Sequence, residues 1–260
     1  MSPITQPAVP GAAQRRTRGR NAWQLDPEHV DLRRAALEAE PIEIDARPQR
    51  ITMDLSRTAL VVVDMQNDFC HRDGWLSGIG VDVTPARAPI TPLRSLIPSL
   101  RDRGVPIVWV NWGNRPDRAN LPPGVLHVYD PAGSGVGIGS RANAAGAPVL
   151  ERGSWSAAIV DELVQEPWDV CVDKYRMSGF VDTPLDSILR NLRVDTLLFA
   201  GVNADQCVLA TLADAADLGY DVVMLTDAVG TTSPEFCMEA TVYNVRQCYG
   251  FTAESGAFTG

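Results

Sequence analysis

From position 58 onward, the chain alternates short apolar runs with longer amphipathic stretches. Each run places β-branched and other apolar residues at consecutive positions, which is typical of parallel strands covered on both faces. The runs are TALVVVDM (58–65), VPIVWVNW (105–112), DVCVDK (169–174), DTLLFAGV (195–202) and YDVVMLTDA (220–228), and a sixth, shorter strand is predicted near residues 250–252.

The amphipathic stretches between these runs predict helices at residues 90–103, 155–164, 182–192, 205–218 and 233–248. Pro184 and Pro234 stand where proline favours the first turn of a helix, and Gly219 stands where glycine favours its end. Strict alternation of strand and helix predicts a three-layer α/β/α fold, with a doubly wound, six-stranded parallel sheet of the Rossmann-like type. In such sheets the site gathers at the carboxyl ends of the strands.

Composition divides the chain into a predicted flexible leader, residues 1–45, and a folded domain, residues 46–260. The first 25 residues contain four arginines, no acid and many Pro, Ala and Gln residues, a composition that favours disorder. Within the domain, residues 114–148 are rich in Gly, Pro, Ser and Ala. This segment is predicted to be a long loop that serves as a lid or as a subunit contact.

Charge and cysteine content limit which partners and which cellular location we expect for the chain. The net charge of −9 argues against a nucleic-acid partner, which would require clustered cations. No apolar run approaches the ~20 residues of a membrane span, and no secretory signal is present, so we expect no membrane partner. The five cysteines form no C-x-x-C pair, which indicates free thiols and a cytoplasmic location.

Three polar residues stand where apolar runs end. Asp64 closes the first run, Lys174 closes the third, and Cys207 lies in the first turn of the helix that follows the fourth. A helix N-terminus and a nearby ammonium both favour thiolate, while a buried carboxylate can accept the thiol proton. Backbone N–H groups in the same turn can form an oxyanion hole. The trio therefore predicts acyl transfer through a covalent thioester.

Each member of the trio also has an ordinary structural interpretation. Asp64 alone would cap a strand end, Cys207 alone would be a small buried hydrophobe, and Lys174 alone would be a solvated charge. Their joint position at three strand ends of one sheet favours the catalytic interpretation.

A cysteine–histidine mechanism is disfavoured by the positions of the histidines. His29 lies in the leader, His71 in the loop after the first run and His127 in the long loop. No ligand spacing suggests a metal site, and no glycine-rich phosphate loop follows a strand. We therefore expect neither a metal nor a cofactor.

Three segments together resemble the signature blocks of the isochorismatase-like cysteine hydrolases: LVVVDMQNDF, VDKYRMSGF and GVNADQCVLATLADAADLGYDVVMLTDA. The resemblance spans about residues 46–251 and implies that Asp64 is the general base and then acid, that Lys174 orients and charges the site, and that Cys207 is the nucleophile. It also implies a cis peptide between Val202 and Asn203, with the backbone N–H groups of Asn203 and Cys207 forming the oxyanion hole. Asn203 stands where many relatives carry Thr.

The substrate is expected to be a small ureido or carbamoyl compound, because other segments are similar to ureidoacrylate amidohydrolases and to biuret hydrolases. Met177 stands where the ureidoacrylate enzymes carry Tyr. An amide-rich rim of Gln66, Asn67, Asn111, Asn114, Asn203 and Gln247 offers the donors and acceptors that a ureido group needs. The candidate substrate-binding residues are Phe69, Asn111, Trp112, Asn114, Met177 and Gln247.

The resemblance, an exposed Trp112 and the long loop favour a homo-oligomer. Three alternatives remain open. The chain could act on another amide, such as an N-carbamoyl amino acid, maleamate or nicotinamide, or it could be an isochorismatase proper, which needs no cysteine. It could also be a non-catalytic binding module, although such a module would be expected to lack a member of the trio.

Overall fold

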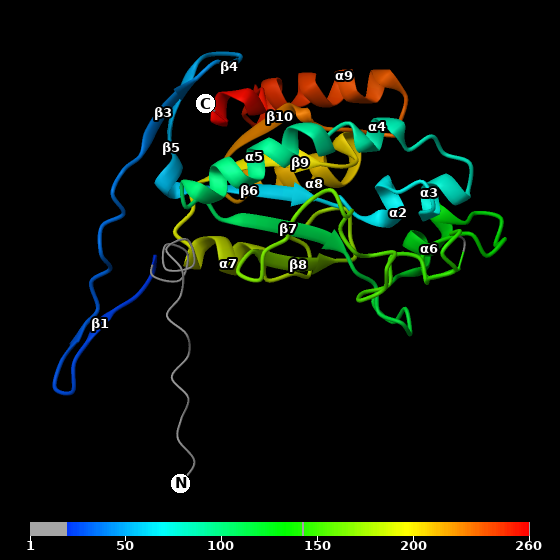
Figure 1. Cartoon of the computed structure of the whole chain (residues 1–260), viewed down its shortest axis with the longest axis horizontal. Helices are drawn as coiled ribbons and strands as arrows, with labels where there is room; N and C mark the ends of the chain where they lie inside the picture. Colours follow the sequence, from blue (N-terminus) through cyan, green and yellow to red (C-terminus); the bar gives the residue numbers. More distant parts are fainter. Residues whose placement is uncertain (1–19, 142, 260) are drawn as a thin grey trace, which may run out of the picture.

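A single mixed sheet forms the centre of the structure, a computed structural model that describes residues 20–141 and 143–259 (Figure 1). Within these residues the sheet has seven strands in the order β4-β11-β10-β9-β6-β7-β8. The strands are β4 (Ala46–Arg47), β6 (Thr58–Val63), β7 (Ile107–Trp112), β8 (Val170–Lys174), β9 (Thr196–Gly201), β10 (Asp221–Val229) and β11 (Phe251–Ala253). The short β4 pairs antiparallel with β11, and the other six are parallel. The predicted six-stranded parallel sheet is confirmed, with one antiparallel strand added at its edge.

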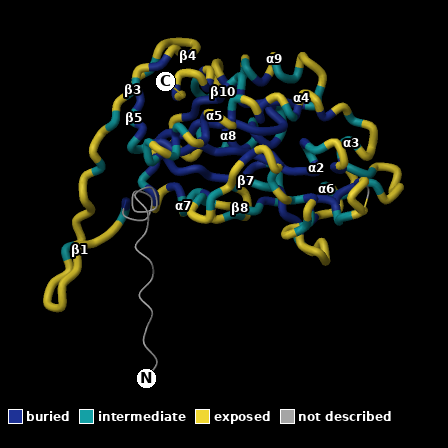
Figure 2. Tube along the Cα trace, in the orientation of Figure 1, coloured by how far each residue is buried: buried dark blue, intermediate teal, exposed yellow. Residues whose placement is uncertain are grey.

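Helices cover both faces of the sheet, which gives the predicted three layers. On one face α5 (Ile90–Asp102) packs onto β6 through a core that includes Leu60 and Leu93. On the other face α7 (Leu185–Asn191) and α8 (Leu209–Asp217) pack onto the same strand through a second core that includes Val61 and Leu212. Figure 2 shows the strands buried between these layers. The continuous apolar runs reflect this burial on both faces.

The remaining helices are α2 (Asn67–Cys70), α3 (Trp75–Gly78), α4 (Thr84–Arg87), α6 (Pro123–Tyr129) and α9 (Glu235–Asn244). The predicted helix at residues 205–218 begins as a π-helical turn, Ala204–Val208, before α8. The one predicted at 233–248 is α9 followed by a second π-helical turn, Val245–Tyr249.

The helix predicted at residues 155–164 is wrong, because this segment consists of turns. Its backbone bonds to the chain after β6: the N–H groups of Asn67 and Asp68 donate to Ala158 and Ser156, at 2.8 and 3.1 Å. Val160 is buried in the core, which explains the apolar positions that suggested a helix. Tertiary hydrogen bonds have replaced the local ones of a helix.

Residues 20–54, which include the described part of the predicted leader, carry two hairpins, and the second hairpin crosses the predicted boundary at residue 45. Strands β1 (Gln24–Leu25) and β2 (Val30–Asp31) form an arm beside the body of the molecule, and β3 (Pro41–Ile44) pairs with β5 (Ile51–Asp54) (Figure 1). Residues 1–19 lie outside the described part, and the division at residue 45 stays a prediction.

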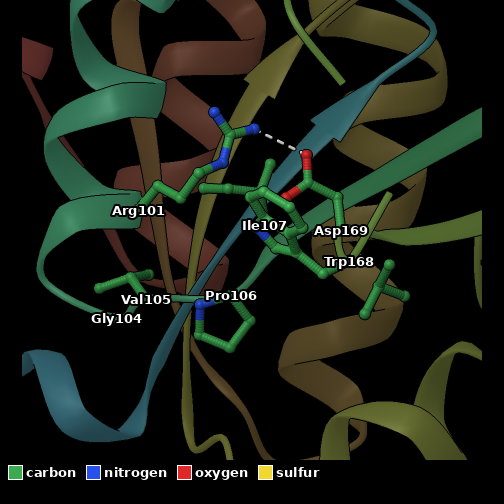
Figure 3. A pocket seen from close by; sticks show the side chains of 8 residues that line it. Arg101, Gly104, Val105, Pro106, Ile107, Trp168 and Asp169 are labelled. Atoms are coloured by element: carbon green, nitrogen blue, oxygen red, sulfur yellow. Dashed lines mark hydrogen bonds and ion pairs between the residues drawn. The ribbon is translucent and has the colours of Figure 1, made fainter. Parts of the chain in front are cut away.

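At the amino-terminal edge of the sheet, structural contacts join α5 to β7 and β8. Arg101 of α5 pairs with Asp169, just before β8, at 2.7 Å (Figure 3). The indole N–H of Trp109 donates to the same carboxylate at 2.9 Å. The cleft beside this pair has a volume of about 10 Å³, enough for one water molecule. It is too small for a substrate.

Among the described residues, no helix is long and apolar enough to cross a membrane.

Candidate active site

Asp64, Lys174 and Cys207 meet at the carboxyl edge of the sheet. Lys174 Nζ lies 2.8 Å from Asp64 Oδ2 and donates to Cys207 Sγ at 3.1 Å. The exposed fractions are 1% for Asp64, 0% for Lys174 and 5% for Cys207. The structure therefore brings the predicted trio together in one buried cluster, with the ammonium between a carboxylate and a thiol.

The topology of the sheet explains this meeting. Strand β6, which precedes Asp64, is central, while β7 and β8 extend to one side and β9 to the other. The chain thus reverses its direction of growth at β6, the type of switch point where open α/β sheets place ligand sites. Lys174 is the last residue of β8, and Cys207 lies in the π-helical turn after β9.

Backbone contacts fix the Asp64 carboxylate. Asp64 has a φ of 50°, and its backbone N–H donates to the Val110 carbonyl at 2.9 Å. The N–H of Trp112 donates to Asp64 Oδ1 at 2.8 Å. This bond occupies one carboxylate oxygen and leaves the other facing Lys174.

The sequence predicted a lowered thiol pKa for Cys207, but the structure indicates the opposite. Burial raises the pKa of the Cys207 thiol to about 12, against the lowering effect of Lys174, and Asp64 raises it further. Burial alone would lower the pKa of Lys174, but its pairing with Asp64 and its hydrogen bond to Cys207 outweigh burial, so this pKa is raised. At neutral pH the site therefore contains a lysine ammonium, paired with Asp64, and a neutral thiol.

The turn that holds Cys207 starts at the predicted cis peptide, Val202–Asn203, which is present. Gly201, with a φ of 107°, lies so close to the Val63 carbonyl that a Cβ would collide with it at 2.0 Å. The Asn203 carbonyl accepts from the N–H groups of Gln206 and Val208 at 3.1 and 3.2 Å. These bonds bracket Cys207 and fix the backbone of the turn on both sides of it.

Three of the predicted substrate-binding residues lie at or beside the trio. Lys174 Nζ stands 4.5 Å from the centre of the Trp112 ring. Met177 places its sulfur 3.8 Å from Cys207 Sγ. Phe69 belongs to the same apolar cluster as Trp112, with its ring edge-on to Trp75 at 6.4 Å. The expectation that Trp112 is exposed is wrong, because only 1% of it is accessible.

Asn111 and Gln247 are not brought to the trio. Asn111 pairs with Asp173, while Trp112 pairs with Lys174, so strand alternation directs Asn111 to the other face. Gln247 is exposed and lines a separate groove beside α9.

Other amide side chains of the predicted rim already form hydrogen bonds to the backbone. Gln66 Nε2 donates to the Trp112 and Ala157 carbonyls at 2.8 and 2.7 Å, and Asn67 Nδ2 donates to the Trp155 carbonyl at 2.9 Å. The Asn203 side chain accepts from the Thr232 N–H at 3.2 Å. Asn114 is fully buried, and neither polar atom of its side chain has a hydrogen-bond partner among the described residues.

Tyr129 was missed by the sequence analysis. It ends α6, the helix inside the predicted loop at 114–148, and its hydroxyl lies 3.9 Å from the Met177 sulfur. Its ring packs edge-on against Trp75 and Trp112, at 5.5 and 6.4 Å. Burial raises its pKa. The composition of the long loop contained no periodic signal that would have separated Tyr129 from its neighbours.

The part of the chain that the structure describes contains no group of three or more His, Cys, Asp or Glu side chains placed to hold a metal ion. Independence from metals stays a prediction.

Comparison with known proteins identifies the family and agrees with the fold. A sequence model of the isochorismatase domain matches residues 58–255. The chain belongs to the isochorismatase family. Ureidoacrylate amidohydrolase RutB of Stutzerimonas stutzeri is 35% identical to this family member over 221 residues, which cover 84% of this chain and 88% of that protein.

Solved structures show the same fold. A cysteine hydrolase from Pseudomonas syringae superposes with a TM-score of 0.65 at 22% identity, covering 78% of this chain and 91% of that one. N-carbamoylsarcosine amidase from Thermoplasma acidophilum superposes with a TM-score of 0.58 at 27% identity, covering 76% and 96% of the two chains. The solved structures thus share the fold of this chain, and the RutB relative is named for the hydrolysis of an amide bond.

Proposed function

We propose that this isochorismatase-family hydrolase cleaves the C–N bond of a small ureido or carbamoyl compound through a thioester on Cys207. One observation carries the proposal: Lys174 Nζ lies within 2.8 Å of Asp64 and 3.1 Å of Cys207 in a buried cluster. A nucleophile, a base and a fixed positive charge are the components that covalent acyl transfer requires.

In the first half-reaction, Cys207 Sγ attacks the substrate carbonyl carbon while its proton passes to Asp64. Because the thiol is neutral at rest, this transfer accompanies the attack. Lys174 keeps its proton and stabilises the negative charge that forms on sulfur. The carbonyl oxygen takes up the electron pair and is held by the backbone N–H groups of Asn203 and Cys207. When the intermediate collapses, the C–N bond breaks and the leaving nitrogen takes the proton from Asp64.

In the second half-reaction, water attacks the thioester carbonyl and gives its proton to Asp64. The C–S bond then breaks, and the sulfur recovers a proton from Asp64. One water is consumed in each cycle, and Asp64 and Cys207 return to their resting states.

The substrate class is supported by the relatives. RutB, at 35% identity, is named for a ureido compound, and N-carbamoylsarcosine amidase is named for a carbamoyl compound. The amide side chains of the predicted rim give weaker support, because those of Gln66 and Asn67 already donate hydrogen bonds to backbone carbonyls. Asn114 retains both of its unpaired polar atoms, and a ureido group could supply partners to them.

A substrate panel tests this proposal. Amine or ammonia release is measured for ureidoacrylate, biuret, N-carbamoyl amino acids, maleamate and nicotinamide, with Cys207→Ala as the control for background hydrolysis. We expect kcat/KM for a ureido or carbamoyl compound to exceed that for nicotinamide by at least about 10²-fold, and rapid acid quenching to trap the acyl group on Cys207. A preference for nicotinamide would overturn the substrate class, and activity retained by Cys207→Ala would overturn the mechanism.

A further inference from the structure

A groove of about 440 Å³ is lined in part by Tyr129 and Met177, two residues that lie beside Cys207. One wall is formed by the end of α6, with Val128 and Tyr129, and the other by α8 and the turn before it. Met177 also lines the groove, and its sulfur lies 3.8 Å from Cys207 Sγ. The groove therefore ends against Met177, and this side chain separates it from the reacting thiol.

The groove is mainly apolar. Leu209, Ala210 and Ala213 line it from the α8 side, and Val128, which is 67% exposed, stands opposite them. An apolar surface of this kind gains free energy when a ligand displaces water from it. The lining thus favours a hydrocarbon portion of a ligand.

The charge in the groove is negative. Asp205 lines it, and its Oδ1 accepts a hydrogen bond from the Thr231 hydroxyl. Gln206 also lines the groove, and its Nε2 donates a hydrogen bond to the Ser233 hydroxyl at 3.2 Å. Of the described residues that line the groove, none is Lys or Arg.

Two basic side chains beside Met177 and Cys207 already have partners. The Lys174 ammonium is paired with Asp64 at 2.8 Å. Arg176, next to Met177, donates to the Asn120 carbonyl at 2.9 Å and lies 3.6 Å from Asp182. A carboxylate in the groove would therefore meet Asp205 without an opposing cation from these two residues.

We infer that this groove binds the part of the substrate beyond the reacting carbonyl, and that this part is an uncharged, mainly apolar group. The inference rests on the proposed function and narrows it: the substrate is a neutral N-substituted urea or carbamoyl compound, not an anion such as ureidoacrylate. Like charges raise the free energy of a bound anion, while burial of a hydrocarbon lowers that of a neutral ligand.

Two ligands of matched shape test the inference. 3-Ureidopropionate ends in a carboxylate, whereas N-(3-methylbutyl)urea has an isopropyl group of similar size at the same position. Their Kd values are measured by calorimetry on full-length Cys207→Ala, so that no turnover interferes. The neutral urea should bind at least about tenfold more tightly. Equal binding, tighter binding of the anion, or no binding of the neutral urea would overturn the inference.

A charge placed in the groove tests the location. Ala213→Arg should strengthen binding of 3-ureidopropionate by about three- to tenfold, the range for a partly exposed ion pair, without strengthening that of the neutral urea. Ala213→Gln is the control for size, and circular dichroism checks the fold. Asp205→Asn should likewise favour binding of 3-ureidopropionate relative to the neutral urea, because it removes the negative charge from the groove. Unchanged preference in both charge variants would place the distal group outside this groove.

These measurements separate the inference from the proposed function. If the wild-type enzyme hydrolyses no ureido or carbamoyl compound, the proposed function fails while the two Kd values still report on the groove. If it hydrolyses the anionic ureido substrates at least as well as the neutral ones, the inference alone fails.

Discussion

Met177 covers Cys207: the thioether sulfur stands 3.8 Å from the thiol sulfur, and only 5% of Cys207 is accessible. Methionine is unbranched and flexible, so this cover can move at a small cost in free energy. The nucleophile is therefore shielded by one adaptable side chain at the end of the groove.

The first prediction concerns this cover. Met177→Ala should speed alkylation of Cys207 by iodoacetamide by about tenfold or more, because the reagent no longer has to displace a side chain. The rate is followed by peptide mass spectrometry, with the exposed Cys248 as an internal comparison in the same sample. An unchanged rate at Cys207 would show that Met177 does not control access.

The second prediction concerns the pH dependence of the same reaction. The thiolate is the species that is alkylated, and the pKa of Cys207 is raised to about 12. Its alkylation rate should therefore rise about tenfold per pH unit from pH 6 to pH 9 without reaching a plateau. A plateau below pH 8 would instead indicate a stabilised thiolate.

The raised thiol pKa also has a consequence for stability. A free cysteine has a pKa of about 8.5, so the folded state binds this proton more tightly than the unfolded state does. The contribution is fully present below pH ~8.5 and is lost as the pH rises toward the folded pKa of about 12. Between pH 7 and pH 10, the wild-type Tm should fall more than that of Cys207→Ala. Parallel curves for the two proteins would contradict the raised pKa.

The fourth prediction concerns the buried ion pair. Asp64→Asn leaves Lys174 without its carboxylate, and Lys174→Met leaves Asp64 without its ammonium. Each change should lower kcat by at least about 10²-fold, and it should cost roughly 3–5 kcal/mol of unfolding free energy, the range for breaking a buried pair. Urea unfolding measures the second quantity. The exposed pair Arg190–Asp186 is the control, and its Arg190→Ala variant should change stability by less than about 1 kcal/mol.

The fifth prediction is independence from metals. Prolonged dialysis of the active enzyme against a strong chelator should leave kcat unchanged. Loss of activity that added zinc or manganese restores would contradict it.

The sheet and the meeting of Asp64, Lys174 and Cys207 could be predicted because both depend on local patterns. Apolar runs mark strands, and residues that end parallel strands must share one edge of the sheet. Strand alternation also contained an unused signal: neighbouring residues such as Asn111 and Trp112 cannot face the same side. That rule alone would have removed Asn111 from the candidate site.

Other features depended on long-range contacts that the sequence pattern does not contain. The pKa of Cys207 reflects burial, which outweighs the lowering effect of Lys174. Gln66 and Asn67 carry the polar atoms of a binding site, but the turns at residues 155–158 use them. The same contacts displaced the helix predicted at 155–164.

The anchoring of Arg20 indicates where the protein can be attached to a surface. Its guanidinium donates to the carbonyls of Leu192 and Ser56, which precede β9 and β6, so this point of the chain is anchored at the amino-terminal edge of the sheet. The groove opens at the opposite, carboxyl edge. With the exposed Cys171 and Cys248 replaced by serine, a sensor surface or resin coupled through a cysteine introduced at the exposed Ala22 would hold the protein at the amino-terminal edge of the sheet, and the groove would face the solution.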